Sequence, residues 1–151
     1  MSGPGYREPA ASGERGETLW VLAPDEAVVR VERRDNRRWS REFYPSKATV
    51  TIGRGAAADL VVRDPNISRW HCRVIFADQT VMVQDEGSTG GIEIDGRKVT
   101  CRALHEGTRV WMCDYWLLVA RRPPGLVLVE CVRCGRQVAA GAPCLFCQPS
   151  P

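Results

Sequence analysis

Between Leu19 and about Ala120 the chain consists of short β-type stretches separated by turn residues, and this pattern most constrains its fold. β-branched and aromatic residues dominate the stretches, whereas Gly, Pro, Asp and Asn cluster between them. No segment shows a convincing helical period. Many short strands with regular turns predict an all-β sandwich. The strands are expected at residues 19–23, 27–33, 39–44, 48–53, 59–62, 70–77, 80–85, 92–94, 97–100, 108–112 and 115–120.

Composition divides the chain into four parts. Residues 1–18 are rich in Gly, Pro, Ser and Glu, which predicts a disordered tail. The β-rich part covers residues 19–120. Two prolines within residues 121–126 cannot donate to a sheet, so this segment is predicted to be a linker. Residues 127–151 then form a separate cysteine-rich part.

The bulk properties fit a cytoplasmic protein that does not insert into a membrane. No stretch approaches the ~20 apolar residues that a membrane span needs, and the N-terminus lacks the apolar core of a secretory signal. The seven cysteines are odd in number and partly clustered, which favours a reducing compartment. Of the 21 basic residues only Lys47 and Lys98 are lysines, a bias that suggests a bacterial genome rich in GC.

Ser68 and His71 raise the question of a nucleophile beside its general base. The apolar run after His71 predicts a strand, in which residues three apart point to opposite faces. Pro65 and Asn66 predict a turn before that strand rather than a helix. The chain also has no pattern of paired catalytic carboxylates and no Walker-type loop. We therefore expect a protein that is not an enzyme.

Three loop segments instead offer groups that bind anions: TIGRG at residues 51–55, NISRWH at 66–71 and DEGSTGG at 85–91. Arg54 provides a planar cation, and Ser68 and Thr89 provide hydroxyl donors. Glycine backbones can expose N–H groups at close range, here at Gly87, Gly90 and Gly91. This chemistry is suited to holding a phosphate group rather than transferring one.

In their order and spacing, Gly53-Arg54, Ser68-x-x-His71 and Ser88-Thr89-Gly90-Gly91 resemble the motifs of the forkhead-associated (FHA) domains. This family binds phosphothreonine peptides, and the resemblance covers roughly residues 19 to 120. It implies a sandwich of about eleven strands whose recognition loops gather at one end. It also implies that Arg54 and Ser68 hold the phosphate oxygens.

The resemblance assigns roles to the remaining motif residues as well. Thr89 would support the phosphate contacts, and Arg69 would line the groove beside the peptide. Gly53 and His71 would support the binding loops, with His71 bracing them by hydrogen bonds and not touching the ligand.

The chain departs from the family pattern at Gly90, where the family has an asparagine that hydrogen-bonds the backbone of the bound peptide. A neutral hydrogen bond contributes roughly 0.5–1.5 kcal/mol, so its loss would weaken binding by up to about tenfold. The departure leaves open that the domain binds an unphosphorylated partner.

The C-terminal stretch CVRCGRQVAAGAPCLFC contains two Cys-x-x-Cys pairs. Two such pairs make a closed tetrahedral site of the structural zinc type, with iron, and disulfides or free thiols, as the alternatives. We expect a small zinc ribbon with one structural Zn²⁺ per chain, in which Gly135 turns the first pair. The four ligands are Cys131, Cys134, Cys144 and Cys147. The other cysteines are predicted to be small core residues: Cys72, Cys101 and Cys113.

The densest basic patch surrounds a predicted hairpin turn at Asp35-Asn36 and contains Arg30, Arg33, Arg34, Arg37, Arg38 and Arg41. It is either the solvated face of a hairpin or a landing site for acidic or phosphorylated partners. Trp39 alone does not make it a platform for nucleic acid, since the formal net charge is only +3 and aromatic residues are sparse there.

The sequence therefore predicts a two-module adaptor in bacterial Ser/Thr kinase signalling. The FHA domain would bind a phosphothreonine-containing protein made by an upstream Ser/Thr kinase, and the ribbon would supply a second contact surface. One alternative is a phospho-independent interaction module of a larger assembly, such as a secretion apparatus. Another is a nucleic-acid-binding protein that uses the ribbon and the arginine hairpin.

Overall fold

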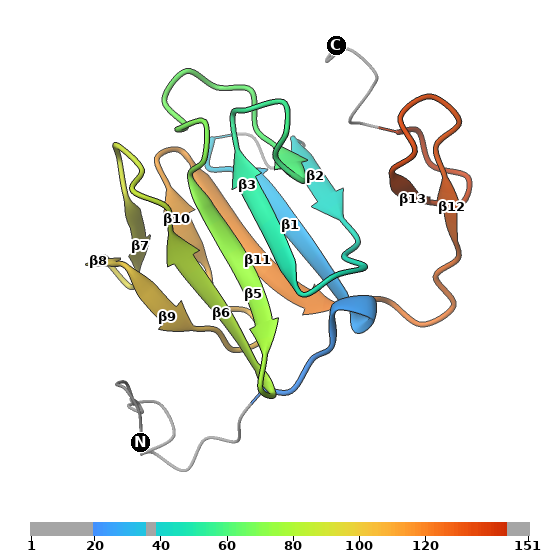
Figure 1. Cartoon of the computed structure of the whole chain (residues 1–151), viewed down its shortest axis with the longest axis horizontal. Coiled ribbons are helices and arrows are strands. Elements are labelled where there is room, and N and C mark those ends of the chain that lie inside the picture. The colour runs from blue at the N-terminus through green and yellow to red at the C-terminus, as the bar shows by residue number, and fades with distance from the viewer. Residues whose placement is uncertain (1–19, 36–38, 145–151) are drawn as a thin grey trace.

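The computed structural model describes residues 20–35 and 39–144, and this part of the chain is all β apart from a short 3₁₀ helix at Pro24–Glu26. Eleven strands form two sheets of six and five strands, and two further strands form a small hairpin (Figure 1). The predicted all-β sandwich of about eleven strands is confirmed.

The six-stranded sheet has the order β2-β1-β11-β10-β7-β8. Its strands are β1 (Ala27–Arg33), β2 (Ser40–Phe43), β7 (Ile92–Ile94), β8 (Arg97–Val99), β10 (Val110–Met112) and β11 (Tyr115–Arg121). The five-stranded sheet has the order β4-β3-β5-β6-β9. Its strands are β3 (Thr49–Gly53), β4 (Leu60–Val61), β5 (Cys72–Ala77), β6 (Thr80–Asp85) and β9 (Cys101–Ala103).

The core lies between the two sheets, because their strands alternate buried and more exposed side chains. In β5, for example, Cys72, Val74 and Phe76 are buried, whereas Arg73 and Ile75 are only partly covered. The facing sheet contributes buried residues in the same way. These include Val29, Val31, Leu117 and Val119.

Two strand predictions are wrong. Residues 20–23 form no strand, although Leu22 from this segment is buried in the core, and Pro24 begins the 3₁₀ helix instead. The apolar run resembles a strand in composition, but only Leu22 in it is buried and Val21 is 49% exposed. Conversely, β9 was not predicted, because Cys101–Ala103 is exposed throughout and shows no alternation, yet it pairs with β6 at the sheet edge.

Strand register places the three motif loops at one end of the sandwich. Ile52 pairs with Cys72, and Cys72 pairs with Asp85, so the end of β3, the start of β5 and the end of β6 lie together. The chain enters the sandwich near Pro24 at the opposite end (Figure 1).

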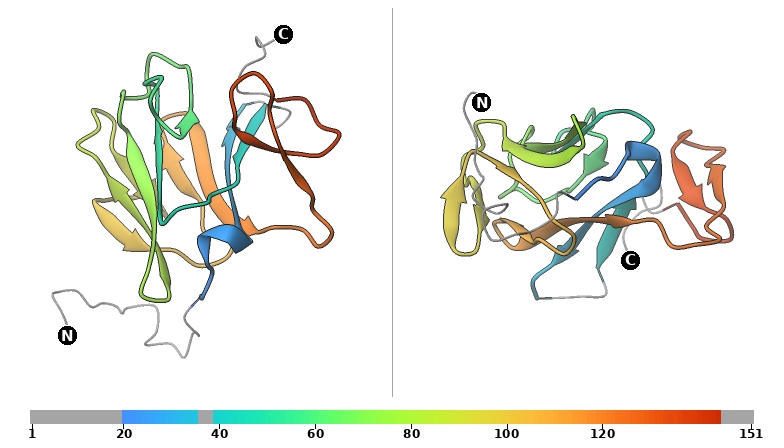
Figure 2. Two further views of the ribbon diagram at one scale, coloured as in Figure 1. Left: turned by 45° about the vertical axis from the view of Figure 1, so that its right-hand side comes forward. Right: turned by 90° about the horizontal axis from the view of Figure 1, so that it is seen from below.

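A separate hairpin follows the sandwich and consists of β12 (Leu128–Glu130) and β13 (Gln137–Ala139). It stands to one side of the two layers (Figure 2). Arg121 still belongs to β11, and the guanidinium of Arg122 donates to the carbonyl oxygens of Ala27 and Pro45 at 2.8 and 2.7 Å. Nothing in the described part of the chain forms a helix long and apolar enough to cross a membrane.

Candidate functional site: the recognition loops and a cysteine cluster

Gly53, at the end of β3, lies directly against the loop that contains Ser68. A Cβ atom at position 53 would lie 2.1 Å from the carbonyl oxygen of Arg69, closer than any side chain allows. The backbone N–H groups of the next two residues, Arg54 and Gly55, donate to the carbonyls of Ser68 and Arg69 at 2.9 and 3.1 Å. The absence of a side chain at Gly53 therefore lets the two motif loops share a backbone ladder.

Arg54 is exposed and is oriented by the same neighbouring loop. Its Nε donates to the carbonyl oxygen of Ile67 at 2.9 Å. The described residues provide no partner for its terminal amino groups, so these donors remain available at the surface. Arg69 is also exposed, and its aliphatic chain passes over Gly55, where a Cβ would lie 2.7 Å from Cγ.

Ser68 and Thr89 connect the second and third motif loops. The hydroxyl oxygen of Ser68 accepts the backbone N–H of Thr89 at 2.9 Å, which leaves the hydroxyl hydrogen of Ser68 able to donate outward. The Thr89 side chain is exposed. Arg54, Ser68 and Thr89 thus belong to loops that contact one another.

His71 is completely buried and bridges the loops from beneath. Its Nδ1 accepts the backbone N–H of Ser68 at 3.1 Å, and its Nε2 lies 2.9 Å from the carbonyl oxygen of Gly91. Because a carbonyl can only accept, the proton resides on Nε2. Both residues of the Ser-x-x-His pair precede β5, which begins at Cys72 rather than at the predicted residue 70. The strand argument for opposite faces therefore does not apply.

The glycine-rich loop uses most of its backbone N–H groups internally. Asp85 accepts the N–H groups of Gly87 and Ser88 at 3.1 and 3.2 Å, and the Ser88 hydroxyl accepts the N–H of Gly91 at 2.9 Å. The expectation that these glycines expose N–H groups to an anion fails at Gly87 and Gly91. Their positive φ angles, 72° and 74°, instead shape the loop.

Gly90 faces the thiol of Cys113, a residue that sequence reasoning assigned to the core. A Cβ at position 90 would lie 3.0 Å from the Cys113 Sγ, and this thiol donates to the carbonyl oxygen of Asn66 at 3.2 Å. Cys101 and Cys113 are both exposed, so their prediction as core residues is wrong, whereas Cys72 is buried as expected. Partial burial, with smaller effects from Asp114 and Asp64, raises the pKa of the Cys113 thiol and keeps it protonated as a donor.

Tyr115 anchors the Ser68 loop from the neighbouring sheet, a role that no sequence motif indicated. Its hydroxyl donates to Asp64 Oδ2 at 2.8 Å. Burial, together with this hydrogen bond, raises the pKa of Tyr115 to about 12. The contact spans two residues far apart in the chain, so local sequence patterns could not reveal it.

Three of the four predicted metal ligands cluster next to the hairpin. The Sγ atoms of Cys131, Cys134 and Cys144 all lie within 4.8 Å of one another, and those of Cys134 and Cys144 are 3.6 Å apart. Tetrahedral zinc with Zn–S bonds of about 2.3 Å requires sulfur atoms about 3.8 Å apart. Gly135 adopts a φ of 78° and donates its N–H to the carbonyl of Cys131 at 2.8 Å, which closes a tight turn. The three thiols could therefore bind a metal; Cys147 lies outside the described residues.

Comparison with known proteins places this loop arrangement in a family. Residues 50–113 match the family model of the FHA domain. The chain contains an FHA domain. Its two-sheet fold is also found in the FHA domain of the CT664 protein from Chlamydia trachomatis, with 26% identity over 65% of this chain and 99% of that chain and a TM-score of 0.55.

Two further structures share the fold at lower identity. One is EmbR from Mycobacterium tuberculosis in complex with a low-affinity phosphopeptide, with 20% identity over 62% of this chain and 24% of that chain and a TM-score of 0.53. The other is an FHA domain studied for phosphothreonine-dependent interactions, with 22% identity over 64% of this chain and 98% of that chain and a TM-score of 0.53. No curated protein matches the chain.

Proposed function

We propose that the FHA domain binds phosphothreonine in a partner protein, with Arg54 and Ser68 as the phosphate ligands. The observation that carries the proposal is the position of Ser68 between the two neighbouring loops. Its backbone carbonyl accepts the N–H of Arg54, its backbone N–H donates to His71, and its hydroxyl oxygen accepts the N–H of Thr89. This coupling leaves the Ser68 hydroxyl hydrogen and the terminal amino groups of Arg54 as donors. Charge-assisted hydrogen bonds of this type are well suited to a phosphate dianion.

The supporting residues follow from the same geometry. Arg69 and Thr89 are exposed on the two loops beside Ser68, where they can contact a peptide or the phosphate. Gly53 and His71 hold the loops together, and His71 lies buried beneath them. Gly90 offers a backbone N–H but no side-chain amide to the peptide.

Phosphopeptide recognition by FHA domains in the solved structures supports this assignment. One of these structures is EmbR in complex with a low-affinity phosphopeptide, and another similar domain was studied for phosphothreonine-dependent interactions. We infer that the protein is an adaptor rather than an enzyme and acts downstream of a bacterial Ser/Thr kinase. Two exposed thiols, Cys101 and Cys113, support a cytoplasmic location, since they favour a reducing compartment.

We further propose an FHA domain at residues 19–120, extended by Arg121 of β11, then a linker up to residue 126 and a zinc ribbon at 127–151. Cys147 would complete the site of Cys131, Cys134 and Cys144, and the four thiolates would fill a tetrahedral shell with no position left for a catalytic water. The metal would order the hairpin and its exposed surface as a second contact site for partners.

The test is an affinity capture from lysate of the native organism, with and without phosphatase treatment, analysed by mass spectrometry. Partners captured only from untreated lysate, and lost with Arg54→Ala bait, support phosphothreonine binding. Partners captured equally after phosphatase treatment favour a phospho-independent module. The packing of Cys113 against Gly90, where the family has a ligand-binding side chain, is the observation on which that second candidate rests.

A further inference from the structure

The outer face of the six-stranded sheet carries two tryptophans side by side. Trp111 in β10 is paired with Trp116 in β11, and their ring centroids lie 4.5 Å apart at an interplanar angle of 38°. The neighbours of these residues, Val110, Met112 and Leu117, are buried in the core, so alternation directs both tryptophans outward.

Each tryptophan is covered by one arginine. The guanidinium of Arg34 lies 4.3 Å from the ring centroid of Trp111, and that of Arg109 lies 4.1 Å from the ring of Trp116. Nearby Arg30 pairs with Glu42, but within residues 20–35 and 39–144 no carboxylate lies within ion-pair distance of Arg34 or Arg109. The face therefore presents two oriented cations whose charge has no carboxylate partner.

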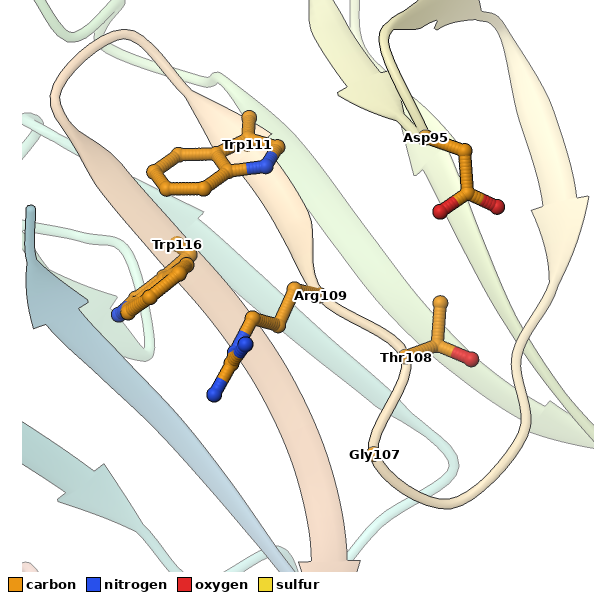
Figure 3. Close-up of a pocket in the computed structure, with 6 residues that line it drawn as sticks. All are labelled: Asp95, Gly107, Thr108, Arg109, Trp111 and Trp116. Carbon is orange, nitrogen blue, oxygen red and sulfur yellow. The ribbon is translucent and has the colours of Figure 1, made fainter.

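A cavity of about 320 Å³ opens beside this stack. It is lined by Asp95, Gly107, Thr108, Arg109, Trp111 and Trp116 (Figure 3). The cavity is separate from the phosphate site, because Asp95 follows β7 and Thr108 precedes β10, whereas Gly91 and Cys113 lie at the other ends of these strands.

Sheet order also brings the arginine-rich hairpin to this face. Strand β1, which leads into Arg34, lies next to β11, and β11 lies next to β10. The sequence showed Trp39 as the one aromatic residue beside this basic patch, since Trp111 and Trp116 are remote from it in the chain. The fold places Arg34 of this patch over Trp111.

We propose that this arginine–tryptophan face is a second binding site that takes an acidic segment of a partner protein. Carboxylates of the segment would pair with Arg34 and Arg109, and its apolar atoms would enter the cavity beside Trp111. Charge complementarity supports this occupant, because the two guanidinium groups are already oriented by their rings.

A single-stranded nucleic acid fits the same face less well. Bases need open aromatic faces, but Trp116 is only 8% exposed and Arg34 covers Trp111. Glu93 is paired directly with Trp111, and Asp95 lines the cavity. These carboxylates would repel an evenly charged phosphate backbone, whereas a peptide can place its acidic residues over the arginines alone.

The test is an NMR titration of the full chain with a short unphosphorylated peptide that carries two glutamates separated by leucine and serine residues. We expect the peptide to shift the indole N–H signals of Trp111 and Trp116 and to leave the amides of Ser68 and Thr89 in place. The double variant Arg34→Gln/Arg109→Gln should weaken this binding by about three- to thirtyfold, as for the loss of two partly exposed ion pairs. Phosphothreonine-peptide binding should be unchanged in this variant, so the two sites can fail independently.

A control variant removes the same charge elsewhere. Arg102→Gln/Arg133→Gln changes two exposed arginines on β9 and the hairpin, and should bind the acidic peptide as the wild type does. Equal weakening by both double variants would mean that only net charge matters and would overturn the proposal. So would acidic-peptide shifts confined to Ser68 and Thr89, the absence of any shift, or stronger indole shifts with oligothymidylate.

Discussion

The imidazole of His71 holds the backbone of Ser68, whose N–H donates to Nδ1 at 3.1 Å. The other ring nitrogen engages the carbonyl of Gly91, so one buried side chain connects the two loops that flank the proposed phosphate position. The Ser68 hydroxyl is consequently presented from a fixed backbone, while His71 itself stays out of reach of any ligand.

Replacing His71 by alanine should destabilise the domain by about 2–4 kcal/mol, because the change leaves two backbone groups unpaired and opens a cavity. Urea unfolding followed by tryptophan fluorescence measures this cost. A loss below about 0.5 kcal/mol, the range of ordinary surface substitutions, would contradict the bridging role.

Gly53→Ala should destabilise the domain by about 1–3 kcal/mol or more, because the new methyl group would overlap the backbone carbonyl of Arg69 and must push the loops apart. Phosphopeptide affinity should fall with it. The matched control is Gly96→Ala, where no atom lies within 4 Å of the new Cβ and only the positive φ opposes the change. This control should cost about 1 kcal/mol and leave binding intact. If both variants changed the affinity equally, the close approach of Gly53 to the Arg69 carbonyl could not be the reason why binding requires glycine at position 53.

Gly90→Asn restores the side chain that the FHA family uses for the peptide backbone. The φ of Gly90 is not in the left-handed region, so backbone strain does not oppose the change; the obstacle is the Cys113 thiol, 3.0 Å from the new Cβ. We therefore expect the double variant Gly90→Asn/Cys113→Ala to gain about two- to tenfold in affinity for a phosphothreonine peptide, the value of one neutral hydrogen bond.

The single variant Gly90→Asn should gain less, and Cys113→Ala alone should change the affinity little. Calorimetry of all three variants against phosphorylated and unphosphorylated forms of one peptide separates the effects. Weaker binding of a native partner by the double variant, with no gain on any phosphopeptide, would show that Gly90 serves a phospho-independent interaction.

The purified protein should contain one zinc ion per chain, and a chelator should unfold the segment after about residue 126 while leaving the sandwich folded, because metal binding and folding are coupled in so short a segment. Elemental analysis and amide exchange measure the two effects. Cys131→Ser or Cys144→Ser should abolish the stoichiometric metal, whereas Cys101→Ser, a change at an exposed cysteine remote from the cluster in sequence, should retain it. A preparation with neither zinc nor iron at stoichiometry would eliminate the metal site.

Local sequence patterns predicted those parts of the fold in which one strand face is buried. The alternation in β5 and the turn residues between strands are of this kind. Residues 20–23 were wrongly predicted as a strand because Leu22 reaches the core from an irregular segment. Strand β9 was not predicted because both of its faces are exposed. An exposed strand such as β9, whose side chains show no alternation, leaves no pattern of this kind.

The motifs likewise indicated Arg54, Ser68 and His71 but not the residues that position them. Asp64 contacts Tyr115, and Cys113 contacts Asn66, across the two sheets. These contacts depend on the order of the strands in the two sheets, and local sequence patterns do not predict that order. The arginine–tryptophan face depends on the same order, since β1, β11 and β10 become neighbours only in the folded sheet.

The most direct test of the account is calorimetry of Arg54→Ala against a phosphothreonine peptide selected from an oriented peptide library. The wild type should bind the phosphorylated peptide and not its unphosphorylated form. Arg54→Ala should weaken binding by about tenfold to a hundredfold, as expected for charge-assisted hydrogen bonds of roughly 1.5–3 kcal/mol. Arg63→Ala, which removes an exposed arginine from the Ser68 loop, should change the affinity by less than about threefold. If Arg54→Ala binds the phosphopeptide as tightly as the wild type, the loops do not clamp phosphate and the proposed function is wrong.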